Sequence, residues 1–198
     1  MSRQPAQKIT PSRSNATSGH VRQRLLQATR TLLSTDGTKA ATARAICARA
    51  GVQAPSLYHH FGDLQRLHMA AVNASFLEIM AGYRHHSRAV GTPAAIAGAW
   101  QGLLLFAKRE PQMARLLVQS VVEGRTPAAL DLTIRRLTAD LTRMEQAGQL
   151  RVSGEIAARM LWTAAVGAVL LATGDEQPAT GDVDKHLLRT LMSGIMAA

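Results

Sequence analysis

Cysteine, the residue that forms disulfide bonds and many metal clusters, is almost absent from the sequence. Its 198 residues include one cysteine, Cys47, so no disulfide can form within the chain. A lone thiol fits a reducing compartment. Because Cys47 lies between Ile46 and Ala48 on the inner side of a predicted helix, we interpret it as a small buried hydrophobe and not as a redox sensor.

The long apolar runs of secreted and membrane proteins are also missing. The N-terminus lacks the apolar core of a signal peptide. The most apolar stretch, Met160 to Thr173, is shorter than the roughly 20 residues that span a bilayer, and Arg159 and Asp175 bracket it. We therefore expect a cytoplasmic protein without a membrane partner, in which this stretch is buried within protein.

Sequence signatures of common enzymes and metal sites are missing as well. There is no Glu-x-x-His pair, no Gly-x-Ser-x-Gly elbow and no glycine loop that would cradle a phosphate. His68, His85 and His86 lie along one predicted helix, but adjacent helical residues point about 100° apart, and no further ligand completes a site. We predict no catalytic residues, no metal and no cofactor. A helical-bundle enzyme is the least favoured alternative.

Positive charge is in excess, and it is concentrated in the first third of the chain. The formal net charge is +10. Residues 1–66 contain ten Lys or Arg and two Asp, whereas residues 67–198 contain thirteen basic and eleven acidic residues. A basic N-terminal region is the electrostatic footprint expected of nucleic-acid binding. Binding by charge alone, without sequence preference, is the main alternative to a sequence-specific protein.

This basic region contains a helix-turn-helix pattern between Thr42 and Phe61. Thr42 is a good N-cap for a short helix that ends near Arg49. Ala50 to Val52 form the turn, in which Gly51 suits a left-handed backbone position. Four apolar residues would hold the two helices against a third: Ile46, Val52, Leu57 and Phe61.

The second helix of this pattern, from about Gln53 to His59, has a polar face suited to DNA. Pro55 falls in its first turn, where proline is tolerated. Hydroxyls, an imidazole and a small methyl group fit phosphate oxygens and base edges in a major groove. The candidate DNA-binding residues are Thr42, Arg44, Gln53, Ala54, Ser56, Tyr58 and His59. A helix-turn-helix can also serve as a packing unit without DNA contact, with these residues as a solvated face.

The stretch resembles the DNA-binding domain of TetR-type transcriptional regulators. The resemblance covers Val21 to Leu67 and rests on four sets of residues: Ile46, Ala50-Gly51-Val52, Leu57-Tyr58 and His60-Phe61. It implies that Tyr58 and His59 hold phosphates and that the first residues of the second helix face bases. Gln53 departs from the family, which often has a capping serine there. Leu64 replaces a lysine that normally meets the DNA backbone.

Three further features complete the predicted N-terminal part. Residues 1–19 are rich in small polar residues and are interpreted as a disordered basic arm. A helix from His20 to Asp36, ended by Gly37, has apolar residues at helical spacing. Its polar side contains Arg22, Arg24 and Arg30, of which one or more could meet phosphate. The predicted DNA-binding domain therefore spans residues 20–66.

The remaining chain, residues 67–198, is predicted to be helical throughout. A long helix from Leu64 to about Arg88 leaves the DNA-binding domain, and five more helices follow. Their predicted starts are Thr92-Pro93, Pro111, Thr126-Pro127, Ser153 and Asp182. The predicted fold is all-α: an N-terminal three-helix helix-turn-helix head, joined by a long helix to a C-terminal helical domain for ligand binding and dimerisation.

The middle helices contain large soft side chains with few polar ones, a composition that suits a mostly apolar small molecule. The predicted pocket residues are Trp100, Leu104, Met113, Leu117, Gln119, Met160, Trp162 and Thr163. The pocket follows mainly from the family resemblance. Each of these residues taken singly also fits an ordinary helical core, because methionine and aromatic stripes fill helical bundles.

The last two helices are predicted to form a dimer interface. One has small residues that permit close packing, and the other has an apolar stripe. The predicted interface residues are Ala164, Gly167, Ala168, Leu171, Leu187, Leu191 and Ile195. Intramolecular core is the alternative, but a head that reads a palindrome requires a two-fold partner. We thus expect a homodimeric repressor that a small-molecule effector releases from a pseudo-palindromic double-stranded DNA operator.

Overall fold

The computed structural model describes residues 13–84, 92–174 and 183–197, and these are almost entirely helical. The helices are α1 (Arg13–Ala40), α2 (Ala43–Ala50), α3 (Ala54–Phe61), α4 (Leu64–Arg84), α5 (Pro93–Arg109), α6 (Pro111–Val122), α7 (Ala128–Gln146), α8 (Gly154–Ala172) and α9 (Val183–Ile195). Within the described residues, β-structure is limited to an isolated bridge between Leu150 and Met196. The predicted all-α class is confirmed.

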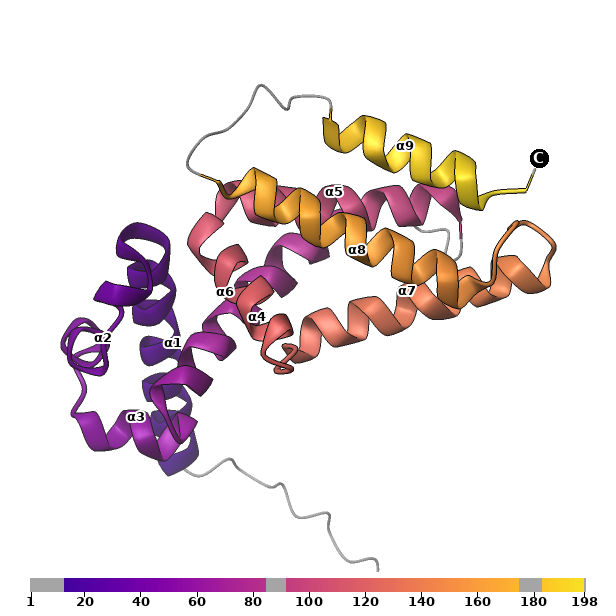
Figure 1. Ribbon diagram of the computed structural model, residues 1–198. Helices are drawn as coiled ribbons and strands as arrows, with labels where there is room; N and C mark the ends of the chain where they lie inside the picture. The colour runs from indigo at the N-terminus through magenta and orange to yellow at the C-terminus, as the bar shows by residue number, and fades with distance from the viewer. Residues whose placement is uncertain (1–12, 85–91, 175–182, 198) are drawn as a thin grey trace, which may run out of the picture.

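Three N-terminal helices form a head, α1–α3, to one side of the other six (Figure 1). Helix α4 leaves the head and passes into the second domain, where it packs against α5, α6 and α7. Helix α6 contacts α1 as well as α8, so it also joins the two parts. Helix α9, yellow in Figure 1, lies over α5 and α8.

Most helix starts follow from local sequence. The hydroxyl of Thr42 accepts from Ala45 N at 3.2 Å, and that of Thr92 accepts from Ala95 N at 3.3 Å. These short-range caps confirm the two predicted N-termini. Ser153 caps α8 in the same way.

The prediction that Thr126-Pro127 caps the helix that follows, α7, is wrong. Helix α7 begins at Ala128 after Pro127, and no side chain of its own N-cap bonds its first turn. Asn73 of α4 supplies the acceptor instead, because its Oδ1 lies 2.8 Å from the backbone N of Ala129. A residue distant in sequence therefore caps the helix.

Helix α1 is longer than predicted at both ends. It begins at Arg13, so residues 13–19 are helical and do not belong to a disordered arm, and residues 1–12 lie outside the described part of the chain. Gly37 has φ +73° and marks a kink, after which one further helical turn reaches Ala40. Only glycine adopts this backbone conformation without strain. The buried Gly37 packs near the side chain of Gln112 on α6.

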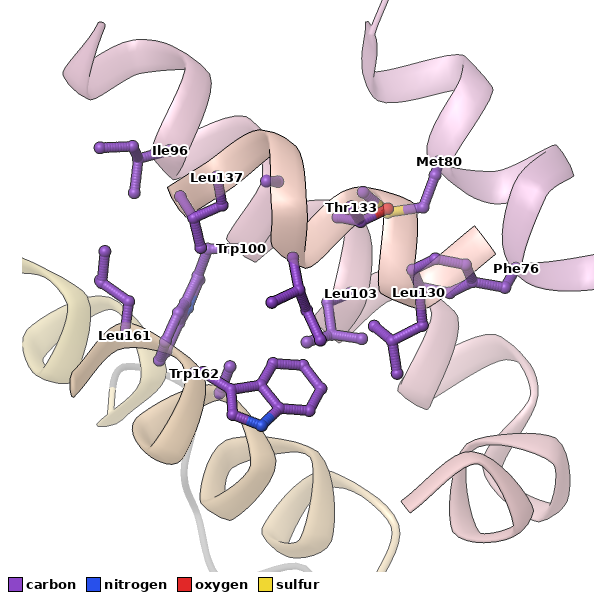
Figure 2. A pocket seen from close by; sticks show the side chains of 13 residues that line it. Phe76, Met80, Ile96, Trp100, Leu103, Leu130, Thr133, Leu137, Leu161 and Trp162 are labelled. Carbon is purple, nitrogen blue, oxygen red and sulfur yellow. The ribbon is translucent and has the colours of Figure 1, made fainter. Parts of the chain in front are cut away.

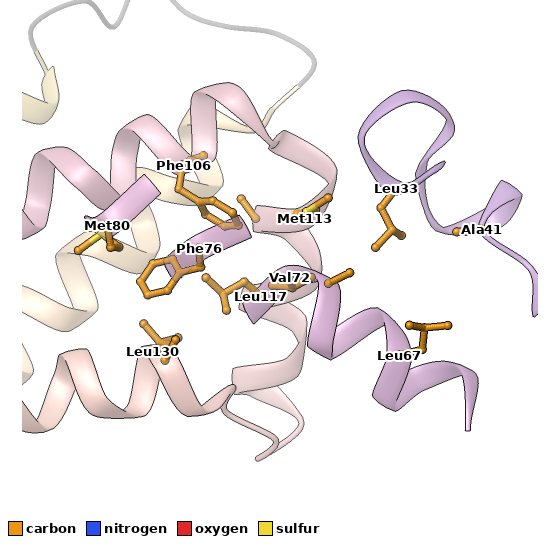
Figure 3. Close-up of a cluster of buried hydrophobic side chains, with 14 of the residues drawn as sticks. Leu33, Ala41, Leu67, Val72, Phe76, Met80, Phe106, Met113, Leu117 and Leu130 are labelled. Atoms are coloured by element: carbon orange, nitrogen blue, oxygen red, sulfur yellow. The ribbon is translucent and has the colours of Figure 1, made fainter. Parts of the chain in front are cut away.

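One apolar cluster, the main core, extends without a break from the head into the second domain (Figure 3). In the head it contains Leu33 of α1 and Leu67 of α4, both fully buried. In the second domain Phe76 meets Phe106 edge to face, with ring centroids 5.5 Å apart. The packing of the head is therefore continuous with that of the second domain, and close-packed interiors of this kind transmit strain.

A smaller cluster, the second core, closes the end of the bundle distant from the head. Its buried members are Ile96, Leu141, Met144, Ala157, Ala158, Leu161 and Ile195. The chain after α9 is tied to the α7–α8 connection by two backbone bonds: Arg151 N donates to Ile195 O at 2.9 Å, and Ala197 N donates to Gln149 O at 2.8 Å. Ile195 is therefore interior to one protomer.

Helix α8 was expected to be buried, and the structure buries only one side of it. It contacts α5, α6, α7 and α9. Within the described residues it is the one helix long and apolar enough, by length and composition alone, to cross a membrane, and 33% of the relevant window is buried. A core helix passes the same test, so this is weak evidence for a span.

Substituting Gly154 tests the close approach of α8 to α7. A Cβ at Gly154 would lie 2.6 Å from the backbone N of Thr142, which cannot rotate away. We expect Gly154→Ala to lower the free energy of unfolding by about 1–3 kcal/mol, the usual cost of overpacking. Urea unfolding at fixed protein concentration measures this change.

The matched control is Gly194→Ala, where a new Cβ meets nothing within 4 Å. Alanine should be neutral or stabilising there by up to about 1 kcal/mol, because Gly194 is helical. Equal destabilisation by both substitutions would contradict the proposed contact between α7 and α8.

Candidate nucleic-acid interface and ligand cavity

Helix α3 has a buried side and an exposed side. Leu57 is fully buried and Phe61 is 8% exposed, so they fix the helix against the rest of the head. Tyr58 is 51% exposed on the opposite side. The predicted DNA-binding residues are accordingly exposed, except that Ser56 is half-buried: Thr42, Arg44, Gln53, Ala54, Tyr58 and His59. Pro55 is also exposed on this helix and was not included in the sequence prediction.

The turn before α3 is closed by backbone bonds. Gly51 has φ 60° and ψ 43°, the left-handed conformation predicted for it. Its N–H donates to Ala48 O at 3.2 Å, and Val52 N donates to Cys47 O at 3.0 Å. The carbonyls of Cys47 and Ala48 near the end of α2 are therefore satisfied, and these bonds restrict the angle between α2 and α3.

Arg24 of α1 locks this turn from outside. Its Nε donates to Ala50 O at 2.8 Å and its Nη2 donates to Gly51 O at 2.6 Å. Arg30 pairs with Glu78 of α4 at 2.7 Å. Arg24 and Arg30, two of the three arginines of which one or more could meet phosphate, are thus engaged within the protein.

The third of these arginines remains exposed. The guanidinium carbon of Arg22 lies 5.0 Å from the centre of the Phe61 ring, a cation–π contact beside the end of α3. At the start of α4, Leu64 is half-buried and packs against the main core, so it offers no charge. The exposed Arg66, paired with Asp63 at 3.4 Å, provides a cation two residues later. Arg66 is not among the DNA-binding residues predicted from the sequence.

Two titratable groups of the head have pKa values shifted by burial. Burial raises the pKa of the Cys47 thiol, which keeps it protonated and unreactive. Burial lowers the pKa of His68, and a hydrogen bond with Ala41 O at 2.8 Å opposes this effect. His68 therefore joins α4 to Ala41, the residue that follows α1.

The structure contains no candidate metal centre in the residues it describes. No group of three or more His, Cys, Asp or Glu side chains lies together there. His85 and His86, considered in the sequence analysis, fall outside the described ranges.

An apolar cavity of about 50 Å³ lies between α4, α5, α7 and α8 (Figure 2). A water molecule needs roughly 10–15 Å³ measured in this way, whereas an engineered cavity that binds benzene has about 150 Å³, so an organic ligand would require the walls to move apart. Its walls consist of Phe76, Met80, Ile96, Ala99, Trp100, Leu103, Leu130, Thr133, Ile134, Leu137, Leu161, Trp162 and Ala165. Thr133 is the one residue among them with a hydroxyl, and that hydroxyl donates to Ala129 O at 2.8 Å.

The structure brings only two of the eight predicted pocket residues to this cavity, Trp100 and Trp162. Three others are buried in the main core and do not line it: Leu104, Met113 and Leu117. The remaining three are exposed: Gln119, Met160 and Thr163. On α8, residues 161, 162 and 165 turn toward the cavity, whereas 160 and 163 lie on the opposite side of the helix.

The wall formed by α7 was missed, although the sequence contains its signal. Leu130, Thr133, Ile134 and Leu137 line the cavity and follow the helical spacing i, i+3, i+4, i+7. Such a stripe shows that one face of α7 is buried. It does not show which other helices share the cavity, so Phe76 and Met80 of α4 could not be added from the sequence.

The opposite side of α8 presents apolar side chains to solvent. At spacings of three and four along the helix these are Ile156 (51% exposed), Met160 (38%), Leu170 (50%) and Leu171 (51%), with Thr163 and Gly167 between them. This set is called the α8 face below. Of the predicted interface residues, Gly167 and Leu171 belong to it, and Ala164 is half-buried beside it.

The other predicted interface residues turn inward. Ala168 is 7% exposed and packs in the main core, and Ile195 is fully buried in the second core. Leu187 and Leu191 of α9 are half-buried against the main and second cores respectively. The apolar stripe of α9 therefore covers its own protomer.

The fold and the exposed helix α3 define a class of protein in which an N-terminal helix-turn-helix domain is followed by a helical domain that contains an apolar cavity. Residues 25–67 match the family model described as bacterial regulatory proteins, tetR family. The sequence-based resemblance to TetR-type regulators is therefore confirmed for the DNA-binding domain.

Solved structures share the fold over most of the chain. RolR in complex with resorcinol aligns with a TM-score of 0.66 at 15% identity, over 91% of this chain and 90% of that one. FadR from Bacillus subtilis, in complex with stearoyl-CoA, aligns with a TM-score of 0.67 at 14% identity, over 87% and 98%. SmeT, the repressor of the Stenotrophomonas maltophilia multidrug efflux pump SmeDEF, aligns with a TM-score of 0.66 at 20% identity, over 89% and 90%. No curated protein matches the sequence.

Removing the contacts of Arg24 tests its role in the head. Arg24→Met keeps most of the apolar stem but loses both donors to the α2–α3 turn. We expect the free energy of unfolding to fall by roughly 1–2 kcal/mol. Two fully buried hydrogen bonds from a charged group would contribute more, but the guanidinium of Arg24 is partly exposed. Urea unfolding of the full chain measures the loss.

Arg49→Met is the control, since Arg49 is an exposed arginine on α2. Its effect should stay within about 0.5 kcal/mol, as for most surface substitutions. An Arg24 variant as stable as this control would show that the turn holds its shape without Arg24.

Proposed function

We propose that the protein is a homodimeric transcriptional repressor that binds a pseudo-palindromic operator and is released by a mostly apolar small molecule. The observation that carries the proposal is the exposed side of α3, which a fixed turn and Arg24 hold in a defined orientation. Each head places α3 in a major groove, with the two half-sites about one helical turn apart or slightly further. Tyr58 and His59 hold phosphates, and Gln53, Ala54 and Ser56 face bases.

The phosphate contacts of this proposal draw on exposed basic residues of the head. Arg44 on α2 and Arg66 at the start of α4 are both exposed. Arg66 compensates for the uncharged Leu64, which follows the α3–α4 turn where the family has a lysine. Contacts to phosphate position the head, whereas contacts to base edges select the sequence.

The α8 face supports a homodimer. Large apolar side chains at helical spacing on one side of a helix gain free energy when they leave water. A second copy offers the same surface, as a two-fold dimer requires. Leu171 and Gly167 are retained from the predicted interface, and Ile156, Met160 and Leu170 are added to it.

The cavity supports a ligand-responsive regulator. Its walls are almost wholly apolar, and they include Phe76 and Met80 of α4, the helix that continues into the head. A ligand bound there favours whichever position of α4 fits it better. The ligand can shift the DNA-binding equilibrium only by its difference in affinity for the two states.

Regulators of this family are not enzymes, so no catalytic activity is assigned. A cytoplasmic location follows from the need to reach the operator. Family habit favours repression of a neighbouring gene or of the repressor's own gene. The rival proposal, nucleic-acid binding by charge alone, predicts a steep salt dependence with little preference among sequences.

Competition binding tests the proposal. The full-length protein is titrated by fluorescence anisotropy against DNA from upstream of its own gene, and against duplexes selected by it from a random library, with random duplex as competitor. Specific binding is expected to exceed binding to random DNA by at least about 1,000-fold at physiological salt. Selection that enriches no sequence would overturn the proposal in favour of binding by charge.

Two kinds of substitution on α3 should affect DNA binding differently. Tyr58→Phe removes one hydrogen bond to phosphate, so we expect a loss of roughly five- to tenfold that is similar for all duplexes. Ser56→Ala and Ala54→Ser change groups at the base edges and should alter the preference among duplexes. Anisotropy titrations on a panel of single-base operator variants separate the two effects. A uniform loss from all three substitutions would contradict the assigned roles.

A charge on the α8 face should weaken the dimer. Leu171→Asp places a carboxylate where the partner is proposed to exclude water, and we expect the dimer dissociation constant to rise by more than tenfold. Analytical ultracentrifugation measures it, and operator affinity should fall in parallel. Leu132→Asp is the control, because Leu132 is a similarly exposed leucine of α7, at 44% against 51% for Leu171. Dimers unaffected by Leu171→Asp would exclude this face as the interface.

A further inference from the structure

A buried hydrogen-bond donor belongs to a residue that lines the cavity. Trp100 of α5 is 6% exposed, and its indole Nε1 has no hydrogen-bond partner among the described residues. The same holds for Ser75 Oγ and Asp184 Oδ1, but neither of those residues lines the cavity. A buried N–H without an acceptor is costly, and such groups are rare in folded proteins. A ligand acceptor that reached this N–H after the walls moved would remove this cost.

The walls also restrict the charge of any occupant. None of the thirteen lining residues is ionisable. A carboxylate or ammonium group placed there would lose its hydration without gaining a counter-ion. The nearest polar alternative, the Thr133 hydroxyl, already donates its proton to Ala129 O. Neutral molecules are therefore favoured over charged ones.

Three aromatic rings contribute to the walls, those of Phe76, Trp100 and Trp162 (Figure 2). They come from α4, α5 and α8, so a flat ligand between them would contact three helices at once. Aromatic rings pair favourably in offset or edge-to-face geometry, beyond the gain from burial. A volume of about 50 Å³ is smaller than the roughly 150 Å³ of a cavity that holds benzene, so even a compact ring enters only if the walls move, and a long acyl chain would require a much larger movement.

We propose that the effector is a compact, neutral aromatic molecule with one hydrogen-bond acceptor, and that the indole N–H of Trp100 donates to this acceptor. This inference rests on the proposed function, because it specifies the ligand of the same cavity. Trp100 is then the residue that determines specificity, and Trp162 contributes only an apolar surface.

Matched probes of equal shape test the inference. Acetophenone has a carbonyl acceptor, α-methylstyrene replaces that oxygen with a methylene group, and benzoate adds a charge. Isothermal titration calorimetry with the full-length dimer should show acetophenone binding roughly tenfold more tightly than α-methylstyrene, because only the ketone satisfies the N–H. Benzoate should bind much more weakly than either. Equal affinities for acetophenone and α-methylstyrene, or tight binding of benzoate, would overturn the inference.

Two variants assign the donor. Trp100→Phe keeps a ring in the wall but removes the N–H, so the ratio of affinities for acetophenone and α-methylstyrene should fall to about one. Trp162→Phe is the matched control and should keep the wild-type ratio. These two are the only tryptophans of the chain, so each variant retains one residue whose fluorescence reports folding and ligand binding. A preference that survives Trp100→Phe would show that another group donates.

Operator release is measured separately, by anisotropy with the same probes. Acetophenone that binds with the expected preference but leaves DNA bound would support the assigned cavity chemistry and contradict ligand-responsive release. Absence of binding by acetophenone and α-methylstyrene would overturn the inference about the cavity, while DNA recognition by α3 would still stand on its own titration.

Discussion

The apolar core that the head shares with the second domain constrains the rest of the structure. Helix α4 runs through it, with Leu67 buried in the head and Phe76 and Met80 in the cavity wall. Both ends of one rigid helix therefore lie in close-packed surroundings. Any occupant that displaces Phe76 acts on the same helix that supports α3. The continuous helix α4 connects the head to the second domain, so the orientation of the head depends on the packing of both parts.

Polar contacts refine this arrangement without supplying most of its stability. Arg30 with Glu78, and Ser34 Oγ with Glu110 Oε2 at 2.6 Å, join α1 to α4 and to the residue between α5 and α6. Both are exposed, and exposed pairs contribute little free energy. Burial of the main core must dominate. These contacts select one orientation of the head among those that the apolar surfaces would allow.

Features set by neighbours in sequence could be predicted, and features set by packing could not. Gly51 and the caps at Thr42 and Thr92 act within three residues, so their chemistry is visible in the sequence. The start of α7 depends on Asn73, which is distant in the chain. The cavity shows the same limit: large side chains identified Trp100 and Trp162, but only the rotation of each helix decides that residue 160 faces outward and residue 161 inward.

Most of the small residues of helix α8 pack within its own protomer. Its alanines at 157, 158, 165 and 168 are buried, because they allow the close approach of α5 and α7 within one protomer. Gly154 does the same where α8 meets the α7 backbone. The inner side also contains Leu161 and Val169, whereas Ile156, Met160, Leu170 and Leu171 lie on the outer side. An interface stabilised by burial needs the larger area, so the face that a second copy would cover is the one with Ile156, Leu170 and Leu171.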